Sequence, residues 1–543
     1  MFPRKIIIPN IWKNLIYFLK SIVYNFLNDR PNLKKVNILM FDAAEDIGEY
    51  NEPLGIEVIA GFLKKNNAEA NIEFHSQSIH GDINNDLSKY DIVALSLPFN
   101  SLSSVDKIYP KINFEKQFMM IGNSLSTFGY KDILGKYPNL ICSLGEGEYS
   151  MLDLVEYIHK RKDFQDIRNI AYIKEGSLRK NPRVLVDAND IVMPERFPEV
   201  INFLKSKKGT FRIEGSRGCL YGGCSFCYIP GKYPNKTRRN VSEEQILKQI
   251  IELDKIGVKM PYFTDEDFIG GNFDRAISIA EKISEAKRNG IISQDMNFYF
   301  NTRAADVINP RWAELSSVFM EAGLNQVFVG IESGSKEQLK RFKKPTSVEN
   351  NKKCLDILEQ NGFNIEVGYI LFDPYSTVKE LKESLDFFDK TRLYNKRVYL
   401  IDNLKITPFS KFHDMAYTKQ LALSPLNVQT VSYDYEFEDA KVQKIWNTAS
   451  KWKRNVEKKY STYEANTRGE SNNIFFAEEA KILNYLEFQV ISNLVKYADS
   501  GIKDYKELCQ KSMKIYENII NHKSKGKRKQ TMYVLNKNKG KAY

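Results

Sequence analysis

Cysteine, histidine and tryptophan are scarce in this chain: it has six, five and four of them in 543 residues. Six cysteines in so long a chain do not make a disulfide framework, which favours a reducing, cytoplasmic environment. No apolar run approaches membrane-spanning length. Residues 1–34 lack the small-residue cleavage site of a signal peptide, and their apolar positions at helical spacing predict an amphipathic helix that docks on the body of the protein.

Acidic residues are absent from residues 523–543, which carry seven lysines and one arginine. These eight charges leave only about +4 of the net +12 for the rest of the chain. We interpret the basic tail as a disordered, solubilising end and expect no specific nucleic-acid partner. Weak contact with a membrane surface, through residues 1–34 or the tail, is the minority interpretation.

The length exceeds one ordinary core, so two or three domains are expected. Residues 35–160 alternate short apolar strands, such as VNILMF (36–41) and DIVALSL (91–97), with amphipathic helices. This order predicts a Rossmann-like, doubly wound parallel sheet with ligands at the carboxyl ends of its strands. Residues 161–208 read as a linker that contains a hairpin, with its turn at Glu175-Gly176.

Residues 209–411 repeat a strand and a helix six times, and chemistry is expected at the carboxyl ends of these strands. They predict a partial (β/α)6 barrel of the TIM type. Four residue pairs have capping-box spacing at expected helix starts: Ser242/Gln245, Ser335/Gln338, Thr346/Glu349 and Thr377/Glu380. Residues 412–522 predict an appended helical domain, and residues 523–543 are the basic tail.

Three of the six cysteines, Cys219, Cys224 and Cys227, are clustered in GSRGCLYGGCSFCY. A structural zinc site needs four protein ligands, and no histidine is near in the sequence, so Cys142, Cys354 or Cys509 would have to close it through folding. A disulfide would leave one thiol over. A [4Fe–4S] cluster on three thiolates leaves one iron open. The position directly after the first barrel strand favours the cluster.

SRGCLYGGCSFCY resembles the cluster loop of radical S-adenosylmethionine (radical SAM) enzymes. FTDEDF, GIESGSKEQLKRFKK, GYILFDPYSTVKELKESLDFF and ITPFSKFHDMA resemble later strand motifs of that family, in order. EPLGIEVIAGFL, IGNSLST and GEGEYSMLDLVEYI are similar to the cobalamin-binding domain often attached to these enzymes. The resemblance covers roughly residues 35–415.

Two departures from the family pattern matter. The usual spacing is C-x3-C-x2-C, and here one more residue separates Cys219 from Cys224. Gly222-Gly223 makes an outward bulge easy to absorb, so we expect all three sulfurs to reach iron. Cobalamin domains that ligate cobalt with histidine often show D-x-H-x-x-G after the first strand, where this chain has Ala44. The resemblance therefore implies a cobalamin without a histidine ligand, or an empty domain.

The resemblance also implies site residues. The expected contacts of S-adenosylmethionine are Phe226, Asp265, Glu266, Arg303, Glu332 and Ser333, with Gly368 and Ile370 beside the adenine. The plainer alternatives are a helix cap for Asp265 or Glu266, a structural salt bridge for Arg303, a cap for Ser335 and strand core for Gly368 and Ile370. Loops at the sheet edge would hold cobalamin through Leu54, Gly55, Ser96, Ser124, Gly145, Glu146 and Gly147.

The implied activity is reductive cleavage of S-adenosylmethionine to a 5′-deoxyadenosyl radical, followed by cobalamin-dependent methylation of an unactivated carbon. The alternatives are radical epimerisation, cyclisation or rearrangement without cobalamin, with Cys354 or Cys509 as hydrogen donors if they are not simply buried, and a non-catalytic scaffold. A flavodoxin- or ferredoxin-type protein is the expected electron donor. The substrate, a small molecule or a peptide, is not legible in the sequence.

Overall fold

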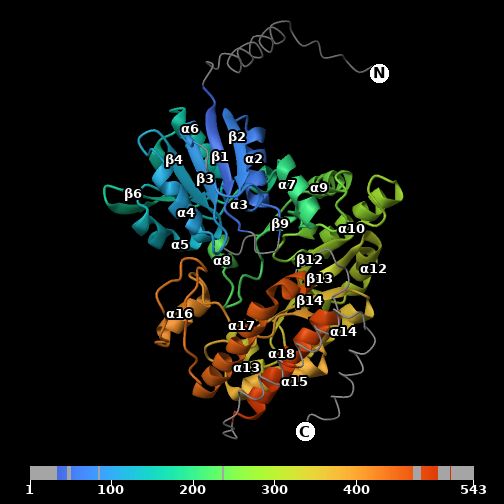
Figure 1. Ribbon diagram of the computed structural model, residues 1–543. Coiled ribbons are helices and arrows are strands. Elements are labelled where there is room, and N and C mark those ends of the chain that lie inside the picture. Colours follow the sequence, from blue (N-terminus) through green and yellow to red (C-terminus); the bar gives the residue numbers. More distant parts are fainter. Residues whose placement is uncertain are drawn as a thin grey trace, which may run out of the picture.

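The computed structural model describes residues 34–45, 50–83, 86–234, 238–468, 478–498 and 514 (Figure 1). The predicted helix over 1–34, the basic tail and Cys509 lie outside the described residues. Within these ranges no helix is long and apolar enough to cross a membrane.

The first sheet is doubly wound, as predicted. Its order is β2-β1-β3-β4-β5-β6-β7, and β1 to β5 run parallel. The strands are β1 (Val36–Asp42), β2 (Ala70–Ser76), β3 (Ile92–Ser96), β4 (Phe118–Gly122) and β5 (Ile141–Ser143). The helices are α2 (Leu54–Lys65), α3 (Gln77–His80), α4 (Ser103–Ile108), α5 (Asn123–Lys136) and α6 (Glu148–Ile158). Alternate strand residues feed separate apolar clusters, one with α4 and α5 and one with α2 and α6.

The predicted hairpin is β6 (Ile170–Lys174) and β7 (Ser177–Lys180). Glu175 and Gly176 both have positive φ, 52° and 72°, as a two-residue type I′ turn requires. The hairpin is not a free-standing connector, because β6 pairs antiparallel with β5 and so extends the first sheet. A further helix, α7 (Pro198–Lys207), leads to the second sheet.

The second sheet has six parallel strands in the order β15-β14-β13-β12-β11-β8, which confirms the partial barrel. They are β8 (Arg212–Ile213), β11 (Tyr262–Phe263), β12 (Phe298–Arg303), β13 (Leu324–Glu332), β14 (Asn364–Tyr369) and β15 (Arg397–Val398). The helices between them are α9 (Glu243–Lys255), α10 (Phe273–Arg288), α11 (Ala304–Val307), α12 (Trp312–Ala322), α13 (Lys336–Arg341), α14 (Val348–Gln360) and α15 (Val378–Lys390).

Helix starts follow the predicted capping pairs in two of four cases. Thr377 and Glu380 form a complete capping box, and Ser242 accepts a hydrogen bond from the Gln245 backbone. The prediction for α14 is wrong by one residue, since Ser347 is its cap. Ser335 is the N-cap residue of α13, as predicted, but its hydroxyl donates to Glu383 at 2.7 Å and makes no cap bond.

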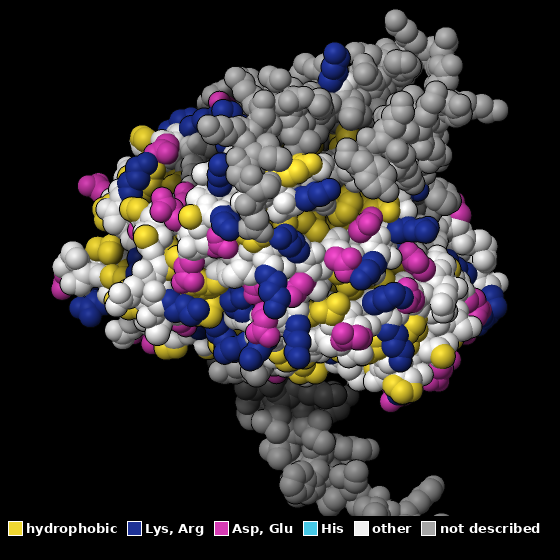
Figure 2. All heavy atoms as spheres, turned by 90° about the horizontal axis from the view of Figure 1, so that it is seen from below, with side chains coloured by type: hydrophobic (Ala, Val, Ile, Leu, Met, Phe, Trp, Pro, Cys, Tyr) yellow, Lys and Arg dark blue, Asp and Glu magenta, His cyan; other side chains and the backbone are white. Residues whose placement is uncertain are grey.

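The C-terminal part has α16 (Lys411–Thr418), α17 (Ala440–Arg468) and α18 (Glu478–Lys496). Side chains of α17 and α18, such as Trp452 and Val490, belong to the same apolar cluster as the barrel strands. Asn484 donates to the Lys396 carbonyl at 2.8 Å, directly before the edge strand β15. The helices therefore complete the barrel core. Seen from below, basic and acidic side chains are interspersed over this face of the molecule (Figure 2).

Candidate cofactor sites

The cysteine loop lies between β9 (Ser216–Arg217) and the short helix α8 (Ile229–Lys232), at the carboxyl end of β8. β9 pairs with β10 (Arg239–Asn240). Burial raises the pKa of Cys227 to about 12, and the charges of Cys224 and Cys219 raise it further. Burial also raises the pKa of Cys224, and Cys219 adds to that rise. The three thiols are thus within electrostatic reach of one another.

All five described cysteines are free. Among the described residues, no group of three or more His, Cys, Asp or Glu side chains could hold a metal ion. A [4Fe–4S] cluster binds its cysteines at separate irons, so its ligands are spread more widely than those of one ion. The thiol chemistry and the loop position fit such a cluster.

The extra residue of the loop is accommodated on its outer side. Gly222 adopts φ of 47°, and Leu220 is 54% exposed. A side chain at Gly223 would start 2.7 Å from the Tyr221 ring. The two glycines therefore allow the turn that the longer spacing needs.

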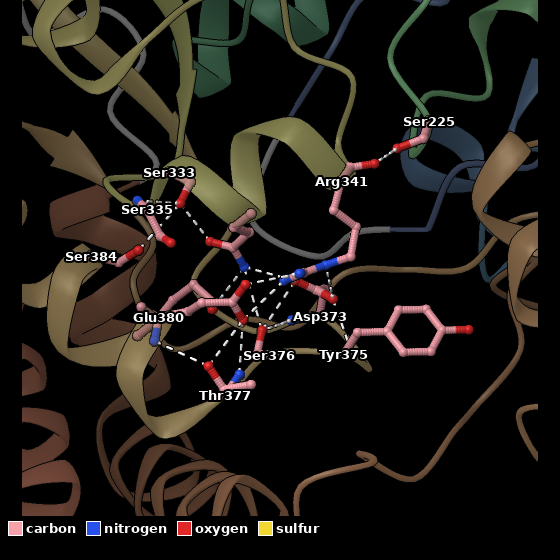
Figure 3. Close-up of polar contacts among 12 residues, drawn as sticks. Ser225, Ser333, Ser335, Arg341, Asp373, Tyr375, Ser376, Thr377, Glu380 and Ser384 are labelled. Carbon is pink, nitrogen blue, oxygen red and sulfur yellow. Dashed lines mark hydrogen bonds and ion pairs between the residues drawn. The ribbon is translucent and has the colours of Figure 1, made fainter. Parts of the chain in front are cut away.

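Ser225 anchors the loop to the turn after α13 (Figure 3). Its amide donates to the Phe342 carbonyl at 2.9 Å and its hydroxyl to the Arg341 carbonyl at 2.8 Å. The Arg341 guanidinium in turn pairs with Asp373 at 2.7 Å and with Glu380 at 2.8 Å. A buried polar network thus fixes the segment between Cys224 and Cys227.

Asp265 and Glu266 follow β11 and accept hydrogen bonds from the backbone segment that leads to the first cysteine. Asp265 is fully buried and accepts from the Gly215 amide at 2.9 Å and from the Ser216 hydroxyl at 2.5 Å. Glu266 accepts from the Gly218 amide at 2.9 Å. Asp265 therefore shapes the loop itself, whereas Glu266 also lines a cavity and remains a candidate for ligand contact.

Arg303 and Glu332 lie at the carboxyl ends of β12 and β13, near the cysteine loop. Arg303 pairs with Asp267 at 2.5 Å, as the salt-bridge alternative expects. Burial opposes its charge, but the neighbouring acids outweigh this and raise its pKa, with a smaller contribution from Cys219. Glu332 pairs with Lys344 at 2.8 Å. Ser333 is fully buried and donates to Gln338, so its position gives no support to a role in binding.

Phe226 and Ile370 pack in one small apolar cluster, where the Phe226 ring meets Phe342 edge-on with centroids 5.3 Å apart. Gly368 lies on β14, where a side chain would start 2.7 Å from the Phe328 ring. Strand packing thus accounts for Gly368, and Phe226 stays beside the cysteines by its position in the chain.

A cavity of about 320 Å³ lies between the first sheet and the start of the barrel. That volume falls within the usual range for sites that bind small-molecule ligands. All seven residues predicted to hold cobalamin line it: Leu54, Gly55, Ser96, Ser124, Gly145, Glu146 and Gly147. The barrel side contributes Arg212, Glu214, Ser216, Arg217, Lys232, Tyr233, Thr264 and Glu266.

The lining leaves free space beside the start of α2 and is mixed in character. Space is open around Gly55, where an added side chain would meet nothing within 4 Å. No histidine is among the lining residues of the described chain. His75 and His80 are engaged elsewhere, with the Gly81 carbonyl and the Ser76 amide. The residues present thus fit a cobalamin, and the described residues around the cavity offer its cobalt no histidine.

An ion cluster joins the cavity to the cysteine loop. Arg217, two residues before Cys219, lies 2.8 Å from Glu146, 2.7 Å from Glu148 and 2.8 Å from Glu214. Its side chain is 6% exposed. Burial opposes its charge, but the carboxylates outweigh this and raise its pKa. Burial raises the pKa of Glu148, while Arg217 opposes that rise.

Residues 213–388 match the model of the radical SAM superfamily. The match identifies this part of the chain as a radical SAM domain. Radical SAM enzymes need an electron donor and a substrate. The chain is 29% identical to the 4′-phospho-dehydrooxetanocin synthase of Priestia megaterium, over 58% of this chain and 45% of that protein. It is 26% identical to the hopanoid C-3 methylase of Methylococcus capsulatus, over 60% and 61%. It thus spans less than two thirds of either relative.

Two solved structures share the fold of this chain. OxsB, a cobalamin-dependent S-adenosylmethionine radical enzyme with aqua-cobalamin bound, matches with a TM-score of 0.70 at 20% identity, over 89% of this chain and 85% of OxsB. The radical S-adenosylmethionine methyltransferase TsrM from Kitasatospora setae matches at 0.63 and 12%, over 86% and 99%. At these identities the likeness concerns the fold alone.

Several supporting residues were not predicted. Ser225 and Arg217 stand inside the cysteine motif, and Lys344 ends GIESGSKEQLKRFKK, yet only the fold shows what each contacts. A charged residue next to a metal-ligand motif was the available signal. Arg217 has one local partner, Glu214, but Glu146 and Glu148 come from a segment about 70 residues away in the sequence.

Asp265 gives the protein a testable pH dependence. Burial raises its pKa to about 6, so the folded state holds this proton more tightly than the unfolded chain. The resulting stabilisation is complete below the ordinary pKa and is lost as pH rises through about 6, by roughly 3 kcal/mol at most. Asp265→Asn should lose this part of the dependence.

The measurement is the midpoint of thermal unfolding, between about pH 4 and about pH 7, for the wild type and the variant. Asp42 and Asp306 also have a pKa raised to about 6, mainly by burial, so the difference between the two proteins is the test. Parallel curves would show that Asp265 does not titrate in this window.

Arg217→Met should cost about 3–5 kcal/mol of stability, because it leaves three buried carboxylates without their shared partner. The matched control is Arg311→Met, since Arg311 pairs with Asp274 at 2.8 Å on the surface and is 42% exposed. It should cost under about 1 kcal/mol. Chemical denaturation of both variants checks this, and equal losses would contradict a central role for Arg217.

Proposed function

We propose that this chain is a cobalamin-dependent radical SAM enzyme with its two cofactors on either side of the ion cluster. Cys219, Cys224 and Cys227 hold a [4Fe–4S] cluster whose remaining iron binds S-adenosylmethionine. The cavity holds cobalamin. The observation that carries the proposal is the cavity itself, because its walls are the ligand loops of the first sheet and the residues that flank the cysteine loop.

Together the bound cofactors supply a 5′-deoxyadenosyl radical and a transferable methyl group. The chain's own part is to position the cofactors and the substrate and to exclude water. Glu266 fixes the Gly218 amide before the first cysteine, and Ser225 fixes the loop before the last. Arg303 and Glu332 present opposite charges at neighbouring strand ends, which suits the carboxylate and ammonium of the methionine part of S-adenosylmethionine.

Methylation of an unactivated carbon is the outcome we favour, since relatives named as hopanoid methylases occur in two organisms. A radical rearrangement is the second candidate, because another relative is named as a synthase rather than a methylase. We propose a flavodoxin- or ferredoxin-type electron donor. Three partly buried free thiols and an oxidisable cluster suit the reducing cytoplasm.

Alanine at Cys219, Cys224 or Cys227 should abolish the cluster and all cleavage of S-adenosylmethionine. Cys142→Ala and Cys354→Ala are matched controls, since both thiols are fully buried away from the loop. The measurements are iron and sulfide per chain after anaerobic reconstitution, and 5′-deoxyadenosine formed with a strong reductant. Cluster-loaded wild type that forms no 5′-deoxyadenosine would refute the enzyme.

Mass spectrometry of the product separates the two outcomes. A product heavier than the substrate by one CH2 group indicates methylation, and an unchanged mass indicates rearrangement. Deuterium transfer from substrate to 5′-deoxyadenosine would show which hydrogen is removed in either case.

A further inference from the structure

Residues 427–432 form a turn that joins the barrel to the first domain, and we call them the docking turn. Asn427 and Ser432 close it with two backbone hydrogen bonds, at 2.9 Å and 3.3 Å. Its base belongs to the barrel side, because the Tyr433 amide, next in the chain, donates to the Ile406 carbonyl at 2.9 Å. In Figure 1 the orange chain around α16 extends up to α5 of the first domain.

The base of the docking turn packs on the apolar cluster beside the cysteine loop. Ile406 and Phe412 belong to that cluster, and Phe226 and Tyr433 pack against it. The Phe412 amide also donates to the carbonyl of Ser225 at 2.7 Å. The docking turn is therefore fixed at its base to the segment that carries the cysteines.

The tip of the docking turn enters the first domain. The Asn100 amide donates to the Gln429 carbonyl at 2.7 Å, and the Leu102 amide donates to the Gln429 side-chain oxygen at 3.1 Å. Val431 is 1% exposed and is part of the apolar cluster that α4 and α5 form with the first sheet. Val428 packs against the same cluster. Main-chain and apolar contacts thus anchor the tip to the chain after β3 and to α5.

Val431 holds a backbone conformation that its side chain disfavours. Its φ is 48°, in the left-handed region that β-branched residues rarely adopt. Such a conformation costs free energy and persists where the surrounding structure fixes it. Here the buried side chain is held inside the cluster of the first domain. Residues with this kind of strain are concentrated at ligand clamps and active sites.

The helix that the docking turn contacts is a wall of the cavity. The first turn of α5 lines the cavity with Asn123, Ser124, Thr127 and Phe128. The Thr127 hydroxyl accepts from the Gly145 amide at 3.0 Å, so α5 also holds a second lining loop. The contact itself is at Gly129, where a Cβ would lie 3.3 Å from the Val428 side chain. A shift of α5 would therefore change the cavity on two sides.

We propose that the docking turn is a positioning element of the cofactor cavity, which fixes α5 against the barrel and so slows the release of the bound cofactor. This inference rests on the proposed cobalamin site. Because its base contacts the cysteine loop and its tip contacts the cavity wall, the turn also fixes the spacing between the two proposed cofactors.

The test is the rate at which hydroxocobalamin leaves the full chain, measured by its transfer to an excess of a cobalamin-binding trap protein. Val431→Ala should release the cofactor about tenfold faster, since lost contacts act mostly on the dissociation rate. Val442→Ala is the matched control, because Val442 is also fully buried but lies in α17, within the barrel cluster. It should lose similar stability and keep the wild-type rate.

Hydrogen exchange of the cofactor-free chain gives a second readout. Amides of α5 should exchange faster in Val431→Ala than in the wild type or in Val442→Ala. If Val431→Ala fails to fold, Gly129→Leu carries the test, because its longer side chain displaces Val428. Its control is Gly135→Leu on the same helix, where a Cβ would meet nothing within 4 Å.

Equal dissociation rates in the deciding variant and its control would overturn the inference. A wild type that takes up no cobalamin would instead refute the proposed function. Hydrogen exchange in α5 would then decide the inference alone, and unchanged exchange would overturn it.

Discussion

The buried ion cluster around Arg217 is the constraint on which the rest of this structure depends. One guanidinium, 6% exposed, meets carboxylates from the loop and helix start after β5 and from the end of β8. Arg239 adds a second cation at 2.8 Å from Glu146. Charges removed from water are costly unless their partners stay in place, so the first sheet and the barrel are held in one arrangement.

That arrangement determines which ligand the carboxyl ends of the two sheets can bind together. The carboxyl ends of parallel strands collect ligand loops in both kinds of sheet. Here the ends of β3, β4 and β5 face the start of the barrel across one cavity. Because Arg217 lies in that wall and also precedes Cys219, a ligand in the cavity and a cluster on the loop would be neighbours. The cysteine loop itself is held on its far side by Ser225 and the turn after α13.

The sequence predicted the fold correctly wherever its hydrophobic periodicity and its motifs indicated the same element. Both sheets, the Glu175-Gly176 turn and the Thr377–Glu380 capping box followed from local patterns. The seven residues expected at a cobalamin site came from the motif resemblance together with loop positions at strand ends, and all seven line the cavity. Long-range partners could not be predicted in this way. Nothing near Ser335 in the sequence shows that its hydroxyl donates to Glu383 and so does not cap the helix. Likewise, the hydrogen bond from the Gly215 amide to Asp265 depends on how β8 and β11 pair.

Cobalamin binding tests the central claim most directly. Hydroxocobalamin would be equilibrated anaerobically with the full chain and with two variants, Gly55→Phe and Gly135→Phe. Both glycines lie in helices with no atom within 4 Å of an added Cβ, but only Gly55 lines the cavity. One cobalamin per chain in the wild type and in Gly135→Phe, with loss in Gly55→Phe, is the expected result. No binding by the wild type, or undiminished binding by Gly55→Phe, would contradict the account.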